Sequence, residues 1–391
     1  MSGEFQREIP LSSRRNIGIS VNIVTPSGGN AFHGQATAVQ VLTRRSPLSC
    51  DMHDRRIGAG VSVALLTAVL HAQTPVQPLK AVPVNALDGI LEAFKSHAVV
   101  ALGEGPHGNE QGHTFRLSLI RDPRFPAVVN DILVEFGTAK YQALLDRFLS
   151  GESVPQRELR HIWQDTTVAT AVWERPIYED FLRAVRALNG TLPASRRIRV
   201  WLGDAPIDWD HIDSPLQLRR WGKQKDEHAI GVVKNRILAT GRRALIIYGD
   251  GHLQGRGFPE RSITNGLERP PEPTKVFAIS SSFTALGKFQ RGVSAWPVPS
   301  LAKIAGTVIG MRPYAQFYPM PPRPGWNTVR LQDQFDAVLY LGDKPRIAAF
   351  PSALCRDAEY MKMRLARMEF DAPQARRARI AALQEFCAAQ R

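Results

Sequence analysis

Three short apolar runs of the sequence are each followed by side chains that can carry or accept a proton. These side chains are Glu104 and His107 after the first run, Glu135 after the second and His252 after the third. A short, continuous apolar run is typical of a buried parallel strand, and in open α/β sheets ligands bind beyond the carboxyl ends of such strands. We therefore expect the four side chains to converge on one cleft, which indicates an enzyme or a metal-binding protein rather than a scaffold.

These residue types support two kinds of chemistry. A neutral histidine held by a carboxylate can deprotonate water for attack on an ester or amide bond. The same side chains can hold a divalent metal ion that lowers the pKa of bound water. For such a site we predict His107, Glu135 and His252 as metal ligands. Glu135 follows an apolar strand, where a carboxylate needs a cation, a metal or a proton to be buried.

A further apolar run ends in Gly203 and Asp204, and Asp208 follows four residues later. If this run is a strand of the same sheet, Asp204 reaches the same edge, and we include it among the candidate catalytic residues. The alternative is a structural role, because aspartates beside a proline commonly form turns.

The elements that must position these side chains follow an alternating pattern. Strands are expected at 98–102, 131–136, 198–202, 244–248, 275–280 and 337–341, and helices at 87–97, 109–121, 138–150, 155–163, 173–189, 224–240 and 371–389. Residues 256–274 and 312–327 are rich in glycine or proline and are expected to be loops. Alternating strands and helices predict an α/β fold with a largely parallel central sheet, helices on both faces and the cleft at the carboxyl ends of the strands.

The first part of the chain has a different character. Residues 52–72 have the pattern of a secretory signal peptide, with two arginines, an apolar core at 57–70 and Ala72 at the cleavage position. The core is shorter than the about 20 residues that span a membrane, and a buried core helix is the alternative. We predict a periplasmic or secreted protein whose mature part is a single α/β domain at 73–391, with a helical C-terminus. No lipobox cysteine follows the core, so we expect no stable membrane anchor.

Residues 1–51 precede this signal and form an anomalous leader. The stretch at 16–34 resembles a segment of the plug of TonB-dependent outer-membrane receptors, and the sequence of a barrel does not follow it. We interpret the leader as a fusion remnant or as the result of a start codon assigned too early.

Charge and cysteine content exclude some classes of function. The formal net charge is +14, yet the arginines are scattered and no basic motif is interleaved with aromatic residues. We therefore predict no nucleic-acid partner. The three cysteines, Cys50, Cys355 and Cys387, have no metal-knuckle spacing, which excludes a thiolate zinc site. We expect free or buried thiols, with pairing of Cys355 and Cys387 in an oxidising compartment as the alternative.

Three motifs together resemble a known superfamily. They are the Gly-Glu-x-x-His-Gly turn at 103–108, a downstream strand ending in Glu135, and the Gly-x-x-His turn at 249–252. This set resembles the erythromycin esterase-like, ChaN-like and TraB/Tiki superfamily over about residues 95–255. For the esterase branch the resemblance implies that His107 is the general base, that Glu104, Glu135 and His252 complete the site, and that Arg116 contributes.

Depending on the branch, the resemblance implies opening of a macrolide lactone, metal-dependent peptide cleavage or binding of haem iron. The sequence thus predicts a hydrolase with a His/Glu centre, with or without a divalent metal, that acts on an ester or amide bond of a small molecule or peptide. The alternative is a haem- or metal-binding protein of iron uptake without turnover, and a fold that has lost its activity is a third reading. The substrate and the oligomeric state are not predicted.

Overall fold

The computed structural model describes residues 77–256, 262–281, 293–318, 328–371 and 373–390. The predicted leader at 1–51, its plug-like segment and the signal at 52–72 lie outside the described residues. Within the described part, no helix is both long enough and apolar enough to cross a membrane.

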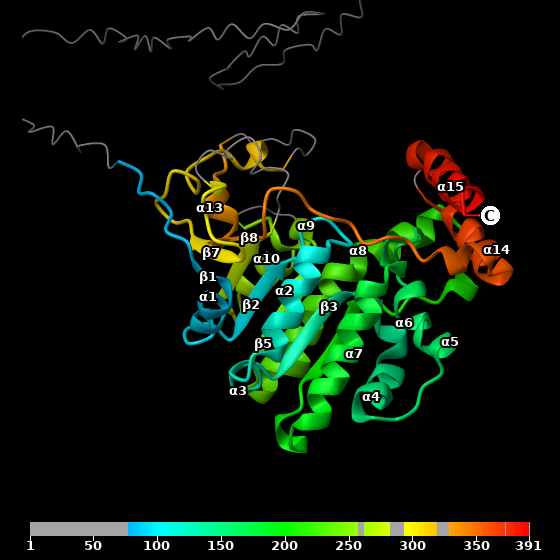
Figure 1. Ribbon diagram of the computed structural model, residues 1–391, viewed down its shortest axis with the longest axis horizontal. Helices are drawn as coiled ribbons and strands as arrows, with labels where there is room; N and C mark the ends of the chain where they lie inside the picture. Colours follow the sequence, from blue (N-terminus) through cyan, green and yellow to red (C-terminus); the bar gives the residue numbers. More distant parts are fainter. Residues whose placement is uncertain (1–76, 257–261, 282–292, 319–327, 372, 391) are drawn as a thin grey trace, which may run out of the picture. The chain divides into compact units, whose positions relative to one another are not determined.

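One eight-stranded sheet organises the described residues (Figure 1). Its order is β1-β7-β8-β6-β2-β5-β3-β4, and β6, β2, β5, β3, β4 and β8 pair in parallel, whereas β7 and β1 are antiparallel at one edge. The bounds are β1 Val84–Asn85, β2 Val99–Gly103, β3 Asp131–Thr138, β4 Arg199–Asp204, β5 Ala244–Tyr248, β6 Val276–Ser280, β7 Ser300–Lys303 and β8 Ala337–Tyr340. The predicted α/β fold with a largely parallel sheet is confirmed.

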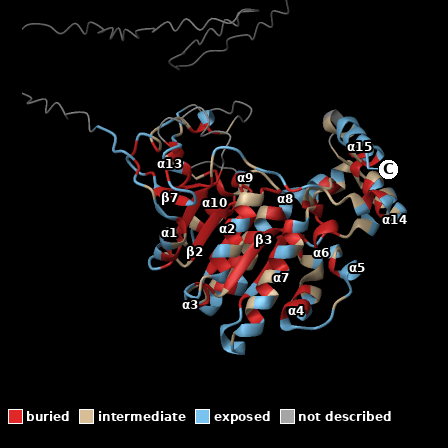
Figure 2. Cartoon of the chain, viewed as in Figure 1, coloured by how far each residue is buried: buried red, intermediate tan, exposed pale blue. Residues whose placement is uncertain are grey.

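Helices cover both faces of the sheet, because the central strands are apolar on both sides. Val100 and Leu102 of β2 pack with helices of one face, and Val99 and Ala101 with helices of the other. On the first face lie α1 Ala86–Ala93, α2 Glu110–Arg121, α3 Phe125–Val128, α4 Gln142–Ser150, α5 Gln156–Leu159, α6 His161–Gln164 and α7 Pro176–Thr191. On the second lie α8 Pro215–Val232, α9 Asp250–Leu253, α10 Ile263–Glu268 and α13 Leu331–Gln334. Figure 2 shows the strands buried between helices whose outer sides are exposed.

Some predicted boundaries were wrong. The helix expected at 224–240 begins at Pro215, where Ser214 caps it and accepts a hydrogen bond from the Gln217 amide. The expected loop at 256–274 contains α10, which begins after the cap residue Ser262. The strands β1 and β7 were not predicted, because they have only two and four residues.

The chain ends in two helices, α14 Ala358–Met368 and α15 Pro373–Ala388, of which only the second was predicted. A disulfide joins Cys355, in the segment before α14, to Cys387 of α15, with 5.2 Å between the Cα atoms. The expectation of free thiols was therefore wrong for this pair. The two cysteines are 32 residues apart in the sequence, and the packing of α14 against α15 brings them into bonding distance.

Candidate functional site

The turn that follows β2 carries the first two candidate residues. Gly105 and Gly108 have φ values of 68° and 81°, a region that glycine enters without strain. A Cβ on Gly105 would also lie 2.5 Å from the backbone oxygen of Ser281. Asn109 then caps α2 by accepting from the Gln111 and Gly112 amides. This tight turn holds Glu104 and His107 at the carboxyl end of the strand.

Glu104 and His107 form a hydrogen-bonded pair. Nδ1 of His107 lies 2.8 Å from Oε2 of Glu104, and Arg116 of α2 donates to Oε1 of the same carboxylate at 3.5 Å. Glu104 is buried with 2% of its side chain exposed, whereas His107 keeps 35% exposed. Burial lowers the pKa of His107, but the hydrogen bond and charge of Glu104 and the charge of Glu135 outweigh it and raise the pKa above 6.5. The ring is thus oriented by a carboxylate and reachable from solvent.

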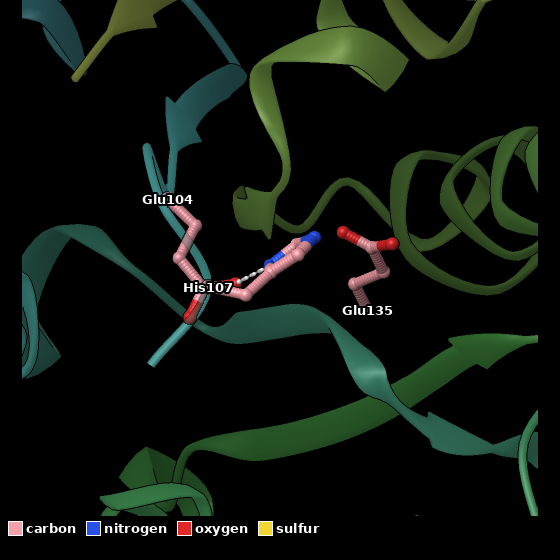
Figure 3. A group of neighbouring side chains, drawn as sticks. All are labelled: Glu104, His107 and Glu135. Carbon is pink, nitrogen blue, oxygen red and sulfur yellow. Dashed lines mark hydrogen bonds and ion pairs between the residues drawn. The ribbon is translucent and has the colours of Figure 1, made fainter. Parts of the chain in front are cut away.

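Glu135 lies in β3 and faces the other side of the His107 ring (Figure 3). Its Oε1 accepts from Lys225 at 3.1 Å and lies 3.3 Å from Nε2 of His252. Its Oε2 accepts from the Gly249 amide at 2.7 Å. Burial favours the neutral acid, but the charges of Lys225 and His252 outweigh it and hold the pKa of Glu135 well below 4.5. Glu135 is therefore a buried, ionised carboxylate.

Gly249, directly after β5, lies close to both His107 and Glu135. A Cβ at this position would lie 3.2 Å from Cε1 of His107 and 3.3 Å from Oε2 of Glu135. A side chain here would push against both groups, so the glycine lets the β5 end approach the pair. Since β5 lies between β2 and β3 in the sheet, the three strand ends are neighbours.

His252 contacts two carboxylates of the candidate site through its two ring nitrogens. Nδ1 lies 2.5 Å from Asp226 of α8, and Nε2 faces Glu135. Burial lowers the pKa of His252, but the Glu135 charge and the Asp226 hydrogen bond raise it to about 10. At neutral pH this ring is therefore a cation between two carboxylates.

The described residues contain one group able to hold a metal ion, and it differs from the predicted ligand set. Glu104, His107 and Glu135 each offer a ligand atom, and these atoms lie within 4.8 Å of one another. His252, predicted as a ligand, lies outside this group. Its two nitrogens face the carboxylates of Asp226 and Glu135. Glu104 takes part instead, although we predicted only a catalytic role for it.

Asp204 is completely buried at the end of β4. Thr167 donates to both of its oxygens, from its amide at 2.5 Å and from its hydroxyl at 2.7 Å. Among the described site residues, Asp204 pairs with Lys225, whose Nζ lies 3.7 Å from its Oδ1. Asp208 is partly exposed and pairs with Lys140 and His211. The described partners of Asp204 and Asp208 do not include His107.

Sequence reasoning missed two residues that complete the site. Lys225 is buried beside Glu135 and Asp204, and Asp226 bonds His252. Both lie in the charged stretch Lys223-Gln224-Lys225-Asp226-Glu227, which has the character of a solvated helix surface. The sequence gives one indication of Lys225, because carboxylates buried at the ends of strands need a cation beside them.

A third missed residue ties the strand ends together. Asp250 is buried directly after β5 and is the second residue of the Gly-x-x-His motif. Its Oδ1 accepts from the Gly105 amide at 3.1 Å, and its Oδ2 accepts from the Ser280 hydroxyl at 2.8 Å, the Ser281 amide at 3.2 Å and the Tyr318 hydroxyl. Asp250 thereby joins the His107 turn to the end of β6.

Comparison with known proteins identifies no family. Neither the protein-family models nor the curated proteins contain a match. Solved structures that are similar include the type III effector HopBA1, with 12% identity over 68% of this chain and 99% of that one and a TM-score of 0.38. They also include a ChaN structure from Campylobacter jejuni, described as binding haem cofacially, with 14% identity, coverage of 54% and 94% and a TM-score of 0.36. A Bacillus cereus protein has 11% identity, coverage of 69% and 97% and a TM-score of 0.39.

These similarities are distant and assign no activity to this chain. The ChaN part of the predicted resemblance has a distant counterpart among these structures. The resemblances to the esterase and TraB/Tiki branches and to the receptor plug stay predictions.

Proposed function

We propose that this protein is a hydrolase that activates water with His107 and cleaves an ester or amide bond. One observation carries the proposal: the partly exposed His107 ring is bonded through Nδ1 to the buried Glu104. In that arrangement Nδ1 holds the proton, a tautomer that we assign from the hydrogen bond, and Nε2 is left to accept one. A pKa above the ordinary 6.5 strengthens His107 as a base near neutral pH.

Among the described residues, the partners of His107 are Glu104 and the Trp173 ring, which include no serine, threonine or cysteine, and both oxygens of Glu104 already accept hydrogen bonds from His107 and Arg116. We therefore propose water as the nucleophile. Nε2 takes a proton from the water as its oxygen bonds to the substrate carbonyl carbon. The protonated ring then returns that proton to the departing alcohol or amine as the C–O or C–N bond breaks. Glu104 stabilises the imidazolium formed between these steps, and Arg116 donates to the other oxygen of the same carboxylate.

Glu135 has a different part in this proposal. Its charge favours the protonated state of His107 from the side opposite Glu104. Lys225 and the protonated His252 hold Glu135 ionised in a buried position. We propose that Glu135 tunes the His107 base, because all the donors around its oxygens leave it little capacity to bind substrate.

A metal ion is the alternative for the same residues, and the proximity of Glu104, His107 and Glu135 favours it. If bound there, a divalent ion would lower the pKa of water. Both carboxylates, however, already have cationic partners: Arg116 for Glu104, and Lys225 with His252 for Glu135. A metal would have to compete with these contacts, so we propose that the side chains alone carry the reaction.

We also propose a periplasmic or secreted location. Disulfides form and persist in oxidising compartments and are rare in the reducing cytosol. The Cys355–Cys387 disulfide therefore supports the location that the signal-like segment at 52–72 predicts.

The test uses the full chain with a panel of ester and amide substrates. We expect His107→Asn to lower kcat about 100-fold or more, because losing a general base typically costs about 10²–10⁴ in rate. Glu104→Gln should lower it by about tenfold or more, because the amide cannot stabilise the imidazolium. The matched control is His211→Asn, since His211 makes the same contact with Asp208, at 2.8 Å and three residues apart, on the exposed surface. Thermal melts check that each variant is folded.

Turnover measured with a chelator and with added divalent metal distinguishes a reaction carried by the side chains alone from a metal-dependent one. Turnover that persists in chelator and is lost in His107→Asn supports the proposal, whereas full activity of that variant contradicts it. If no substrate is cleaved and calorimetry shows tight metal binding that Glu104→Gln and Glu135→Gln both weaken, the site is a metal-binding centre. A haem titration followed by absorbance tests the predicted haem alternative in the same samples.

A further inference from the structure

A buried tryptophan forms one wall of the candidate site. The Trp173 ring meets the His107 ring edge-on, with 4.6 Å between centroids and 71° between planes. Trp173 also packs against Phe136 of β3 and Tyr178 of α7, and only 2% of it is exposed. The hydrogen bond to Glu104 fixes one atom of the imidazole but leaves its plane free to turn about that bond. The Trp173 contact supplies the second restraint.

The loop that carries Trp173 runs from 164 to 174 and is held by an arginine from the other end of the chain. Arg364 of α14 donates to the backbone oxygens of Gln164, Ala169 and Thr170 at 3.3, 3.1 and 3.2 Å. It also donates to Oε1 of Glu174 at 2.6 Å. With 1% of its side chain exposed, Arg364 is buried inside the loop rather than lying on it. One guanidinium thus connects the start, the middle and the end of the loop.

The helix that provides this arginine has anchors of its own. Arg367, one turn further along α14, donates to the Gln164 oxygen at 3.0 Å and to Asp165 at 2.7 Å. The Cys355–Cys387 disulfide ties the segment before α14 to α15. The position of α14, and with it that of Arg364, is therefore fixed from two sides.

The connection from β8 to α14 reaches the His107 turn directly. Residues 342–351 lead across the sheet to α14 (Figure 1), and the Ala348 amide donates to the Gly108 oxygen at 2.8 Å. Arg175, which directly follows the Trp173 loop, donates to the Ala348 oxygen at 2.9 Å. The C-terminal part of the chain thus contacts both the turn that carries His107 and the loop that carries Trp173.

We propose that Arg364 is a positioning residue for the reaction. It holds the 164–174 loop so that Trp173 fixes the plane of the His107 ring and keeps Nε2 directed towards Glu135. The kinetic part of this inference rests on the proposed function, and the structural part does not. Arg364 suits the task because a guanidinium presents several donors in a rigid plane, whereas a lysine ammonium is a compact charge that cannot span the same acceptors.

The main variant is Arg364→Met combined with Glu174→Gln. Removing Arg364 alone would leave the Glu174 carboxylate buried without its cation, which is strongly destabilising. The double variant removes both charges, so the loop loses its clamp without gaining a buried unpaired charge. Arg364→Lys is a milder second variant that keeps a cation for Glu174. The control is Lys362→Met, which removes an exposed charge from the same helix.

Two readouts are measured on the full chain. The first is kcat and KM for a substrate that the wild type cleaves. The second is the emission of Trp173 alone, obtained in each background by subtracting the spectrum of the matching Trp173→Phe protein, because the chain has seven tryptophans. A merely structural arginine would change the melting temperature but neither the kcat of a folded variant nor this emission.

We expect the double variant to lower kcat about tenfold or more, a size typical of a misplaced catalytic group, while KM changes less than about threefold. The Trp173 emission should move to longer wavelength as the loop opens to water, Arg364→Lys should lie between, and Lys362→Met should match the wild type. A folded double variant with wild-type kcat, or with reduced kcat and unchanged Trp173 emission, would overturn the proposal. If the double variant does not fold, Arg364→Lys is judged by the same two outcomes.

Failure of the proposed function gives a different result. If the wild type cleaves no substrate, the hydrolase proposal fails, and the emission alone then decides about Arg364. A shift in the double variant that is absent in Lys362→Met supports its role in positioning Trp173, and an unchanged spectrum refutes it.

Discussion

Lys225→Met tests whether a buried cation holds the site together. Lys225 is 5% exposed, and its ammonium lies 3.1 Å from Glu135 and 3.7 Å from Asp204. Methionine keeps most of the side-chain length and removes the charge. Leaving a buried charge without its partner typically costs about 3–5 kcal/mol. We therefore expect a large loss of stability from a single substitution, although the three residues before Lys225 in α8 are exposed.

The remaining contacts place the expected loss at the lower end of this range. Glu135 keeps the Gly249 amide and His252 as partners, and Asp204 keeps both donors of Thr167. We expect a decrease of about 3 kcal/mol in the free energy of unfolding. At about 2.1 cal/mol/K of unfolding entropy per residue, a domain of about 300 residues should lose roughly 5 °C in melting temperature.

Denaturant unfolding of a double-mutant cycle provides the measurement. Lys225→Met, Glu135→Gln and their combination are compared with the wild type, and Lys223→Met, an exposed lysine on the same helix, is the control. We expect the combined variant to lose at least about 1 kcal/mol less than the sum of the single losses, because residues in one ion pair couple. Losses that add within about 0.5 kcal/mol, or a Lys225→Met protein as stable as the control, would refute the reasoning.

Three further predictions concern groups around the site. His113 is buried, and burial together with the Arg116 charge lowers its pKa to about 4. Between about pH 6.5 and pH 4 the unfolded chain therefore binds more protons than the folded one, and the free energy of unfolding should fall by up to about 3 kcal/mol over this range. Unfolding curves of His113→Leu, measured across the same pH range, should lack this part of the loss. Replacing Cys355 and Cys387 by serine should cost about 3–4 kcal/mol in the chain-entropy model for a separation of 32 residues, and an unchanged denaturation midpoint would contradict it. Asp250→Asn should lower the free energy of unfolding by about 2 kcal/mol and remove most of the activity, because the amide nitrogen cannot accept from the donors around it, among them the Gly105 amide. A folded, fully active variant would show that this anchor is dispensable.

The convergence of the site could be predicted because it follows from the sheet alone. Continuous apolar runs before Glu104, Glu135 and His252 indicate buried parallel strands, and the carboxyl ends of parallel strands share one edge. The sequence contains no direct signal for the order of the strands. That order makes β5 the neighbour of both β2 and β3 and brings His252 to Glu135.

The charge balance of the site could not be predicted in the same way. Lys225 and Asp226 lie in a helix with charged residues on most sides, and only the packing of α8 against the sheet decides which charges turn inward. Arg364 is similar: its helix is far along the chain, and its acceptors are mostly backbone oxygens, which no side-chain pattern reveals. The disulfide depends on the packing of α14 against α15, so the spacing of two cysteines alone left their state open.

The strand order also determines when the site can first exist during synthesis. β5 pairs with β2 on one side and with β3 on the other, so these two strands have no direct ladder with each other. Glu104 and Glu135 leave the ribosome long before Lys225 and His252, their later neighbours. Pairings between distant parts of a chain form late in folding, because a long loop must close first. A growing chain that ends before α8 therefore carries Glu104 and Glu135 without Lys225 and His252, and the site can assemble only after more than half of the chain has been synthesised.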